Sequence, residues 1–368
     1  MNRFEYADNK FSEIEMMIAI PSFIIGVGIL SLPQALASAT TAMDGVFSIL
    51  IAGGIVTFIT WAIAKFAASF PDTTFISYAS LIVSKPVAIL LTFLFAIVFF
   101  SITAYQVRKI ADISKQYLFD QTPVEVISLT FFLVIIYAVS GSRVGIIRLN
   151  MMFFPFILFI AIIVVIFNLN WFKFSNFLPV FQSNINDYLT GVNKSLFSFG
   201  GFGILWFYMA YVNKPNKAPK MAALGTGFPI ALYALIFLAC IGVYGESVTA
   251  SMLYPTVELA KMVEIPGGIL ERFESIFFVI WIMAIFNTTA MAFDITVLAI
   301  NLVFHHIPKI KIIFLLSPLI YAIAMYPQNL IEVSAFETFL NYAVFYYSIF
   351  VLVLLFVVAK IRGVKPSE

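Results

Sequence analysis

Two glycine-rich clusters interrupt apolar runs that are otherwise long enough to cross a membrane. They comprise Gly26, Val27, Gly28 and Ile29 in the first run and Gly200, Gly201, Phe202 and Gly203 in the sixth. Because glycine is a poor helix former, each cluster predicts a break in a spanning helix. Backbone groups freed inside a bilayer must be satisfied, so such breaks are tolerated where they line a cavity or are covered by protein. We expect the two clusters to bind a small molecule between them; close helix packing through small residues is the alternative.

Four further polar side chains in the apolar runs are candidates for this site or for an ion site. Tyr105, in the third run, either donates to a bound carboxylate or packs between helices. Asn287 and Thr288, in the eighth run, either line the cavity or join helices through hydrogen bonds. Asp294 lies in the same run and is a candidate proton or cation site, because acids inside a membrane are functional candidates by default. Its alternative role is that of an interfacial carboxylate paired with a loop lysine.

The chemistry that these residues favour is ligand binding rather than catalysis. An amino-acid carboxylate suits the N–H groups that a helix N-terminus exposes at a break. The sequence contains no Walker loop, nucleophile elbow or zinc-protease helix, so we expect no enzyme activity. His305 and His306 lie beside Lys309 without an accompanying acidic cluster, and we therefore expect neither a metal nor a cofactor.

The composition predicts an integral membrane protein with the lipid bilayer as a partner. Hydrophobic residues make up 62% of the 368 residues, and charged residues only 11%. Soluble domains carry roughly a quarter charged residues. The formal net charge of +2 comes without a basic run, which argues against nucleic-acid binding.

Apolar runs separated by polar residues predict about ten spanning helices in an all-α fold. Their approximate ranges are 14–37, 45–66, 85–117, 124–139, 144–168, 195–212, 222–244, 271–304, 310–325 and 336–360. Ser12 and Glu15 predict a capping box at the start of the first helix. We expect a polar stretch, 170–193, outside the membrane, and a short helix at 256–263.

The ten spans divide into two halves of one transmembrane domain, residues 1–368. The first repeat covers 14–168 and the second 195–360, and each opens with a glycine-broken helix. Because five crossings bring the chain to the opposite face, this pattern indicates an inverted 5+5 repeat with discontinuous helices 1 and 6. At about 1.5 Å per residue, the first break lies about 21 Å from Glu13 and the second about 12 Å from Lys194. Both depths fall near the middle of a hydrocarbon core roughly 30 Å thick.

The placement of lysine and arginine predicts that both termini are cytoplasmic. In this orientation most basic residues lie on the inner side, including those in the segments 3–10, 143–148, 214–220, 309–311 and 360–365. The opposite orientation would reverse the bias.

Three motifs resemble the B subunits of spore germination receptors. The segment from Gly26 to Leu36 is similar to their first-helix motif, and Tyr254-Pro255-Thr256 with Glu258-Leu259 is similar to their outer-loop segment. Glu271-Arg272-Phe273-Glu274-Ser275, followed by Trp281, is similar to the start of their eighth helix. Two positions depart from the family pattern: Tyr254, where tryptophan is frequent, and Gln34, where a basic residue is frequent.

This resemblance implies the amino acid–polyamine–cation transporter superfamily and its leucine-transporter-like fold. Such B subunits are thought to sense germinants, often amino acids or sugars, in the inner membrane of the endospore. They act with a membrane-anchored A subunit and a lipoprotein C subunit. A germinant-sensing permease is therefore the expected function. The alternatives are a proton-coupled amino-acid transporter with Asp294 as the coupling acid, and a channel for water or ions.

Overall fold

The computed structural model describes residues 10–263 and 273–364. Within these ranges the regular structure is helical, apart from one isolated bridge between Phe11 and Val212. This confirms the predicted all-α fold.

In the described part of the chain, six helices are long and apolar enough to cross a membrane. They are α3 (Gly45–Ala68), α5 (Lys85–Tyr117), α7 (Arg143–Phe167), α10 (Ala218–Tyr244), α13 (Phe273–Val303) and α15 (Leu330–Arg362). The bent pair formed by α1 (Glu13–Ile24) and α2 (Gly28–Ala37) makes a seventh crossing when it is taken as one span. The other predicted crossings coincide with shorter segments: α6 (Val124–Ser140), α14 (Lys309–Ala324), and α8 (Ile185–Ser198) with α9 (Leu205–Tyr208).

One predicted boundary was wrong by ten residues. α8 begins at Ile185, so residues 185–193, which were expected in the polar loop, are helical. A second capping box explains this start. The Asn184 side chain accepts from the backbone N–H of Asp187 at 3.1 Å, and the Asp187 carboxylate accepts from the N–H of Asn184 at 2.9 Å.

Short helices complete the two ends of the bundle. α4 (Phe75–Ile82) and α11 (Glu246–Ser251) were not predicted, whereas α12 (Pro255–Lys261) confirms the short helix expected at 256–263. The predicted start of the eighth span at Glu271 lies outside the described residues.

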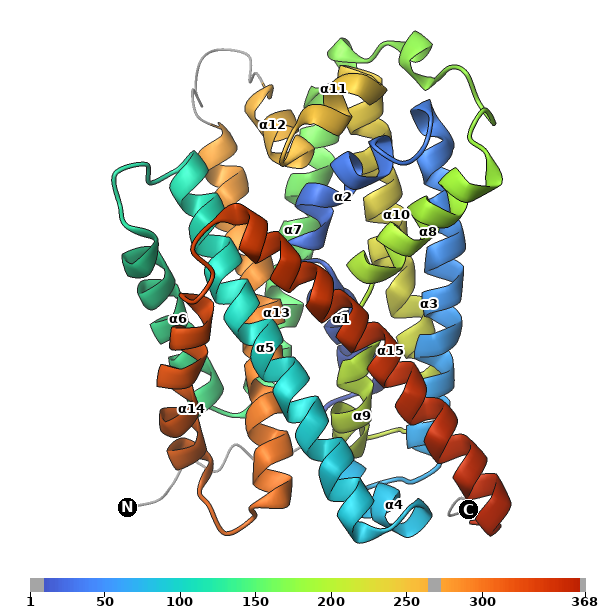
Figure 1. Ribbon diagram of the computed structural model, residues 1–368, viewed down its shortest axis with the longest axis vertical. Coiled ribbons are helices and arrows are strands. Elements are labelled where there is room, and N and C mark those ends of the chain that lie inside the picture. Colours follow the sequence, from blue (N-terminus) through green and yellow to red (C-terminus); the bar gives the residue numbers. More distant parts are fainter. Residues whose placement is uncertain (1–9, 264–272, 365–368) are drawn as a thin grey trace.

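The bundle has two distinct ends (Figure 1). α11 and α12 lie at one end, which we call the α12 face, and α4 lies at the opposite end, the α4 face. α1 begins and α15 ends at the α4 face, so the described chain enters and leaves the bundle on the same side. α5 and α15 run next to each other in opposite directions, joined by Lys109 to Glu337 near one end and by Tyr347 to the Leu91 carbonyl further along.

Both predicted helix breaks are present. The Ser12–Glu15 capping box starts α1 as expected, and the chain then bends by 56° between Ile24 and Gly28. In the second half, α8 ends at Ser198 and the helix resumes at Phe202 as a single 3-10 turn.

Aromatic packing holds the short helix that follows the second break. Trp206 of α9 is almost fully buried and packs edge-on against Phe66 and Phe75, with ring centroids 6.2 and 5.8 Å apart. Phe207 packs in the same way against Phe95 at 5.5 Å. Each such pair contributes about 0.5–1.5 kcal/mol beyond its buried area. A helix as short as α9 is unstable alone, so these contacts position the second half of the broken crossing.

Candidate functional site

A cavity of about 100 Å³ lies between the two helix breaks. The first break lines it with Gly26, Val27 and Gly28, and the second with Gly200 and Gly201. This volume is several times the roughly 10–15 Å³ that a cavity needs to hold one water molecule, so the cavity admits a small molecule. The two breaks are in direct contact, since a Cβ atom at Gly201 would lie 2.3 Å from Cγ1 of Ile24.

Tyr233 of α10 joins the two breaks. Its hydroxyl donates to the Ile24 carbonyl at 2.9 Å and lies 3.5 Å from the Ser198 carbonyl at the end of α8. Both carbonyls belong to residues that end a helix, and the Ile24 carbonyl also accepts from the backbone N–H of Gly26 at 2.9 Å. The tyrosine therefore adds a side-chain hydrogen bond to the polar backbone at the breaks, in an apolar interior where such groups need partners.

We predict that Tyr233→Phe destabilises the protein by about 1 kcal/mol, because hydrogen bonds between membrane helices average about 0.6 and reach about 1.7 kcal/mol. The measurement is the free energy of unfolding in detergent. Tyr137→Phe is the matched control, since Tyr137 is 81% exposed. Equal stabilities of the two variants would contradict the assigned role of Tyr233.

Two threonines satisfy further carbonyls around the first break. Thr288 of α13 donates to the Phe23 carbonyl at 3.0 Å and also lines the cavity. Thr256 of α12 donates to the Ile29 carbonyl at 2.8 Å. The carbonyl of Ile29 is thus already occupied, although this residue was predicted to face the ligand.

Three other predicted site residues also lie outside the cavity lining. Phe202 packs against Phe345 with ring centroids 5.8 Å apart, and Gly203 lies against Ser348 of α15. Asn287 is fully buried, and within the described residues neither of its amide atoms has a hydrogen-bond partner. Tyr105, by contrast, lines the cavity together with the glycines of both breaks.

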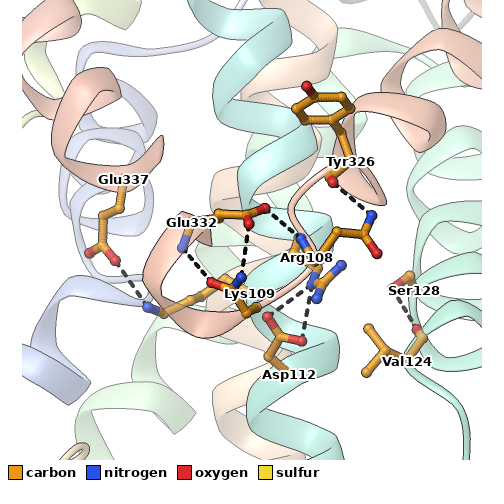
Figure 2. Close-up of polar contacts among 10 residues, drawn as sticks. Arg108, Lys109, Asp112, Val124, Ser128, Tyr326, Glu332 and Glu337 are labelled. Atoms are coloured by element: carbon orange, nitrogen blue, oxygen red, sulfur yellow. Dashed lines mark hydrogen bonds and ion pairs between the residues drawn. The ribbon is translucent and has the colours of Figure 1, made fainter. Parts of the chain in front are cut away.

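An ion pair lies beside the cavity, between α5 and α15 (Figure 2). Lys109 Nζ is 2.9 Å from Glu337 Oε2, and the Lys109 side chain is only 9% exposed. The ammonium group also lies 5.8 and 5.6 Å from the ring centroids of Tyr105 and Tyr254. Tyr254 lies between α11 and α12, where burial raises the pKa of its phenol.

Sequence reasoning missed several lining residues, including Gln106, Asn341 and Glu337. A signal for Glu337 was available, because an acid near the start of a predicted span is a functional candidate. Arg108 and Asp112, two nearby charged residues, do not line the cavity. Figure 2 shows Arg108 directed to Asp112, whose two carboxylate oxygens each lie 3.0 Å from the arginine Nε.

Asp294 lies in a separate polar cluster toward the α4 face. Its carboxylate is fully buried and accepts from Arg143 Nε at 2.6 Å and from the Tyr208 hydroxyl at 3.1 Å. Lys309 Nζ lies 3.6 Å away, and the Arg143 guanidinium stacks over Tyr211 at 4.6 Å. The cluster joins α7, α9, α13 and α14, and Asp294 does not line the cavity between the breaks.

Comparisons with known proteins agree with this architecture. The spore germination protein (spore permease) family matches residues 10–333. The spore germination protein GerLB of Bacillus cereus is 37% identical over 342 residues, covering 92% of this chain and 91% of its own. The spore germination protein YndE of Bacillus subtilis (strain 168) is 29% identical over 354 residues, covering 96% and 97%. The spore germination protein B2 of the same organism is 27% identical over 340 residues, covering 92% of each chain.

Two solved transporters share the fold. MhsT in complex with L-phenylalanine superposes with a TM-score of 0.69 at 16% identity, covering 97% of this chain and 90% of that chain. The nucleobase–cation symport-1 family transporter Mhp1, closed around bromovinylhydantoin, gives 0.68 at 13% identity, covering 92% and 76%. These likenesses confirm the predicted leucine-transporter-like fold. The match over residues 10–333 and the 37% identity to GerLB show that the chain belongs to the spore germination permease family.

Proposed function

We propose that this chain is the germinant-sensing subunit of a spore germination receptor and that it binds an amino acid between the two helix breaks. The observation that carries the proposal is the cavity lined jointly by Gly26 to Gly28 and by Gly200 and Gly201. Membership in a germination family supplies the physiological setting, and the cavity supplies a place for a small molecule.

The lining offers the groups that an amino-acid carboxylate needs. α2 begins at Gly28, and no side chain caps its N-terminus. The first N–H groups of a helix have no partner within the helix and attract anions. A volume of about 100 Å³ favours a small side chain over an aromatic one.

Ligand binding would act by shifting the balance between two arrangements of the bundle, which requires different affinities for the two. A ligand held by both breaks meets this requirement, because any movement of α1 and α2 against α8 and α9 changes its contacts. The receptor A and C subunits would then respond to the change. In this proposal the α4 face, where α1 begins and α15 ends, is cytoplasmic, and the protein lies in the inner membrane of the endospore.

A second candidate function is proton-coupled transport of an amino acid, which the likeness to MhsT and Mhp1 favours. Asp294 would then be the coupling acid. For this role Asp294 must take up a proton, and protonation of the carboxylate must weaken its 2.6 Å contact with Arg143. A channel for water or ions is a further alternative.

Purified protein in liposomes separates these functions. A receptor binds an amino acid from a panel of the common twenty without sustained uptake. Saturable accumulation driven by a proton gradient would instead support the transporter, and flux without any ligand would support the channel. Absence of binding by every amino acid in the panel would overturn the proposed site.

A further inference from the structure

Glu337 is the only charged residue that lines the cavity in the described part of the chain. Its side chain is 23% exposed and lies on α15, and it lines the cavity together with residues of both helix breaks. A carboxylate has about four sites that accept hydrogen bonds. Lys109 occupies one of them at 2.9 Å, which leaves the carboxylate able to accept from a ligand as well.

Two neutral polar groups belong to the same cavity lining as Glu337. Within the described residues, the Gln106 Oε1 atom is buried without a hydrogen bond, and the buried Tyr105 hydroxyl, which lies near the Glu337 carboxylate, forms none of good geometry. Both residues line the cavity. Buried polar atoms are usually hydrogen-bonded, so unpaired ones at a cavity wall indicate a polar guest. A primary ammonium group carries three N–H donors, which matches one carboxylate and these two acceptors.

Lys109 fixes the position of the Glu337 side chain through their ion pair. It does not line the cavity, and its ammonium group lies over the rings of Tyr105 and Tyr254. Cation–π contacts of this kind stabilise a buried ammonium in addition to its ion pair. Lys109 is therefore a positioning residue, whereas Glu337 presents its carboxylate to the cavity.

We infer that Glu337 recognises the ammonium group of the ligand and thereby restricts the ligand class to zwitterionic amino acids. This inference rests on the proposed function, in which the ligand carboxylate lies at the N-terminus of α2. The cavity then offers a positive helix end on one wall and a carboxylate on another. A deaminated acid of the same size would leave Glu337 without a cation, and a sugar would match neither wall.

The test compares the affinity of the full chain for an amino acid and for its deaminated analogue, for example L-alanine and propionate. We expect the wild-type protein to prefer the amino acid, and Glu337→Gln to lower this preference roughly 10- to 100-fold, the range for a hydrogen bond to a charged group. Glu332→Gln is the matched control, because Glu332 is an exposed acid of the same helix that does not line the cavity.

A second variant removes the risk that an unpaired Lys109 unfolds the protein. The double change Lys109→Met/Glu337→Gln eliminates both charges and should show the same loss of preference, while Glu337→Asp should retain most of it. If Glu337→Gln and the double variant keep the wild-type preference, the inference fails. If Glu337→Gln keeps this preference while Gly201→Leu loses all binding, the proposed site stands and the role of Glu337 does not. If the wild-type protein binds no amino acid, the proposed function and the inference on Glu337 both fail.

Discussion

Spores whose only receptor carries Gly201→Leu are expected to lose their response to the germinant, although the altered protein still inserts into the membrane. A Cβ atom at this position would lie 2.3 Å from Cγ1 of Ile24 and 3.3 Å from a ring carbon of Phe23. Real Cβ atoms do not approach so closely, so the second break must move away from the first. The longer side chain of leucine would also fill part of a cavity of only about 100 Å³. The measurement is a germination dose response, with membrane fractions assayed for the protein.

Gly54→Leu is the matched control for this prediction. A Cβ atom at Gly54 meets nothing within 4 Å, and the residue is exposed on α3. This variant should respond normally. Gly201→Ala should already weaken the response, and Ile24→Ala in the same chain should restore part of it by removing Cγ1. A normal dose response in spores carrying Gly201→Leu would show that Gly201 does not belong to the site.

Local sequence chemistry was sufficient to locate the breaks and most helices. Gly26 and Gly28 interrupt a helix for reasons that lie in the backbone of those residues, independently of their neighbours. The Ser12–Glu15 capping box is equally local, and both of its hydrogen bonds are present. The missed start of α8 had a comparable signal in Asn184 and Asp187, which was hidden because the surrounding segment is polar.

The partners of the breaks could not be predicted in this way. Tyr233 lies 209 positions from Ile24, and Thr256 lies 227 positions from Ile29. Nothing in the type of either residue distinguishes it from other tyrosines and threonines until the helices pack. For the same reason Ile29 and Gly203 were expected in the cavity: spacing identifies a broken segment, but packing decides which of its groups remain accessible.

Asp294→Ala is expected to lower the free energy of unfolding by about 3–5 kcal/mol, the cost of removing one partner from a buried ion pair. Asp294 is fully buried, and the Arg143 side chain is only 17% exposed, so water cannot replace the lost carboxylate well. Lys309 loses a second contact at 3.6 Å. The measurement is denaturation of the purified protein in detergent.

The control for this effect is Asp72→Asn. Asp72 forms an ion pair with Lys10 at 2.6 Å, but the two side chains are 66% and 43% exposed, and exposed pairs contribute only about 0–1 kcal/mol. Arg143→Met/Asp294→Leu should regain most of the lost stability, because the two closest charges are removed together. Lys309 loses its contact with Asp294, but it is 32% exposed and keeps its hydrogen bond to the Gly141 carbonyl at 2.8 Å. Comparable stability losses for Asp294→Ala and Asp72→Asn would contradict the account. If the double variant is stable but responds without ligand, the ion pair holds the resting arrangement of α7 against α13; an unchanged response would limit the pair to a structural role.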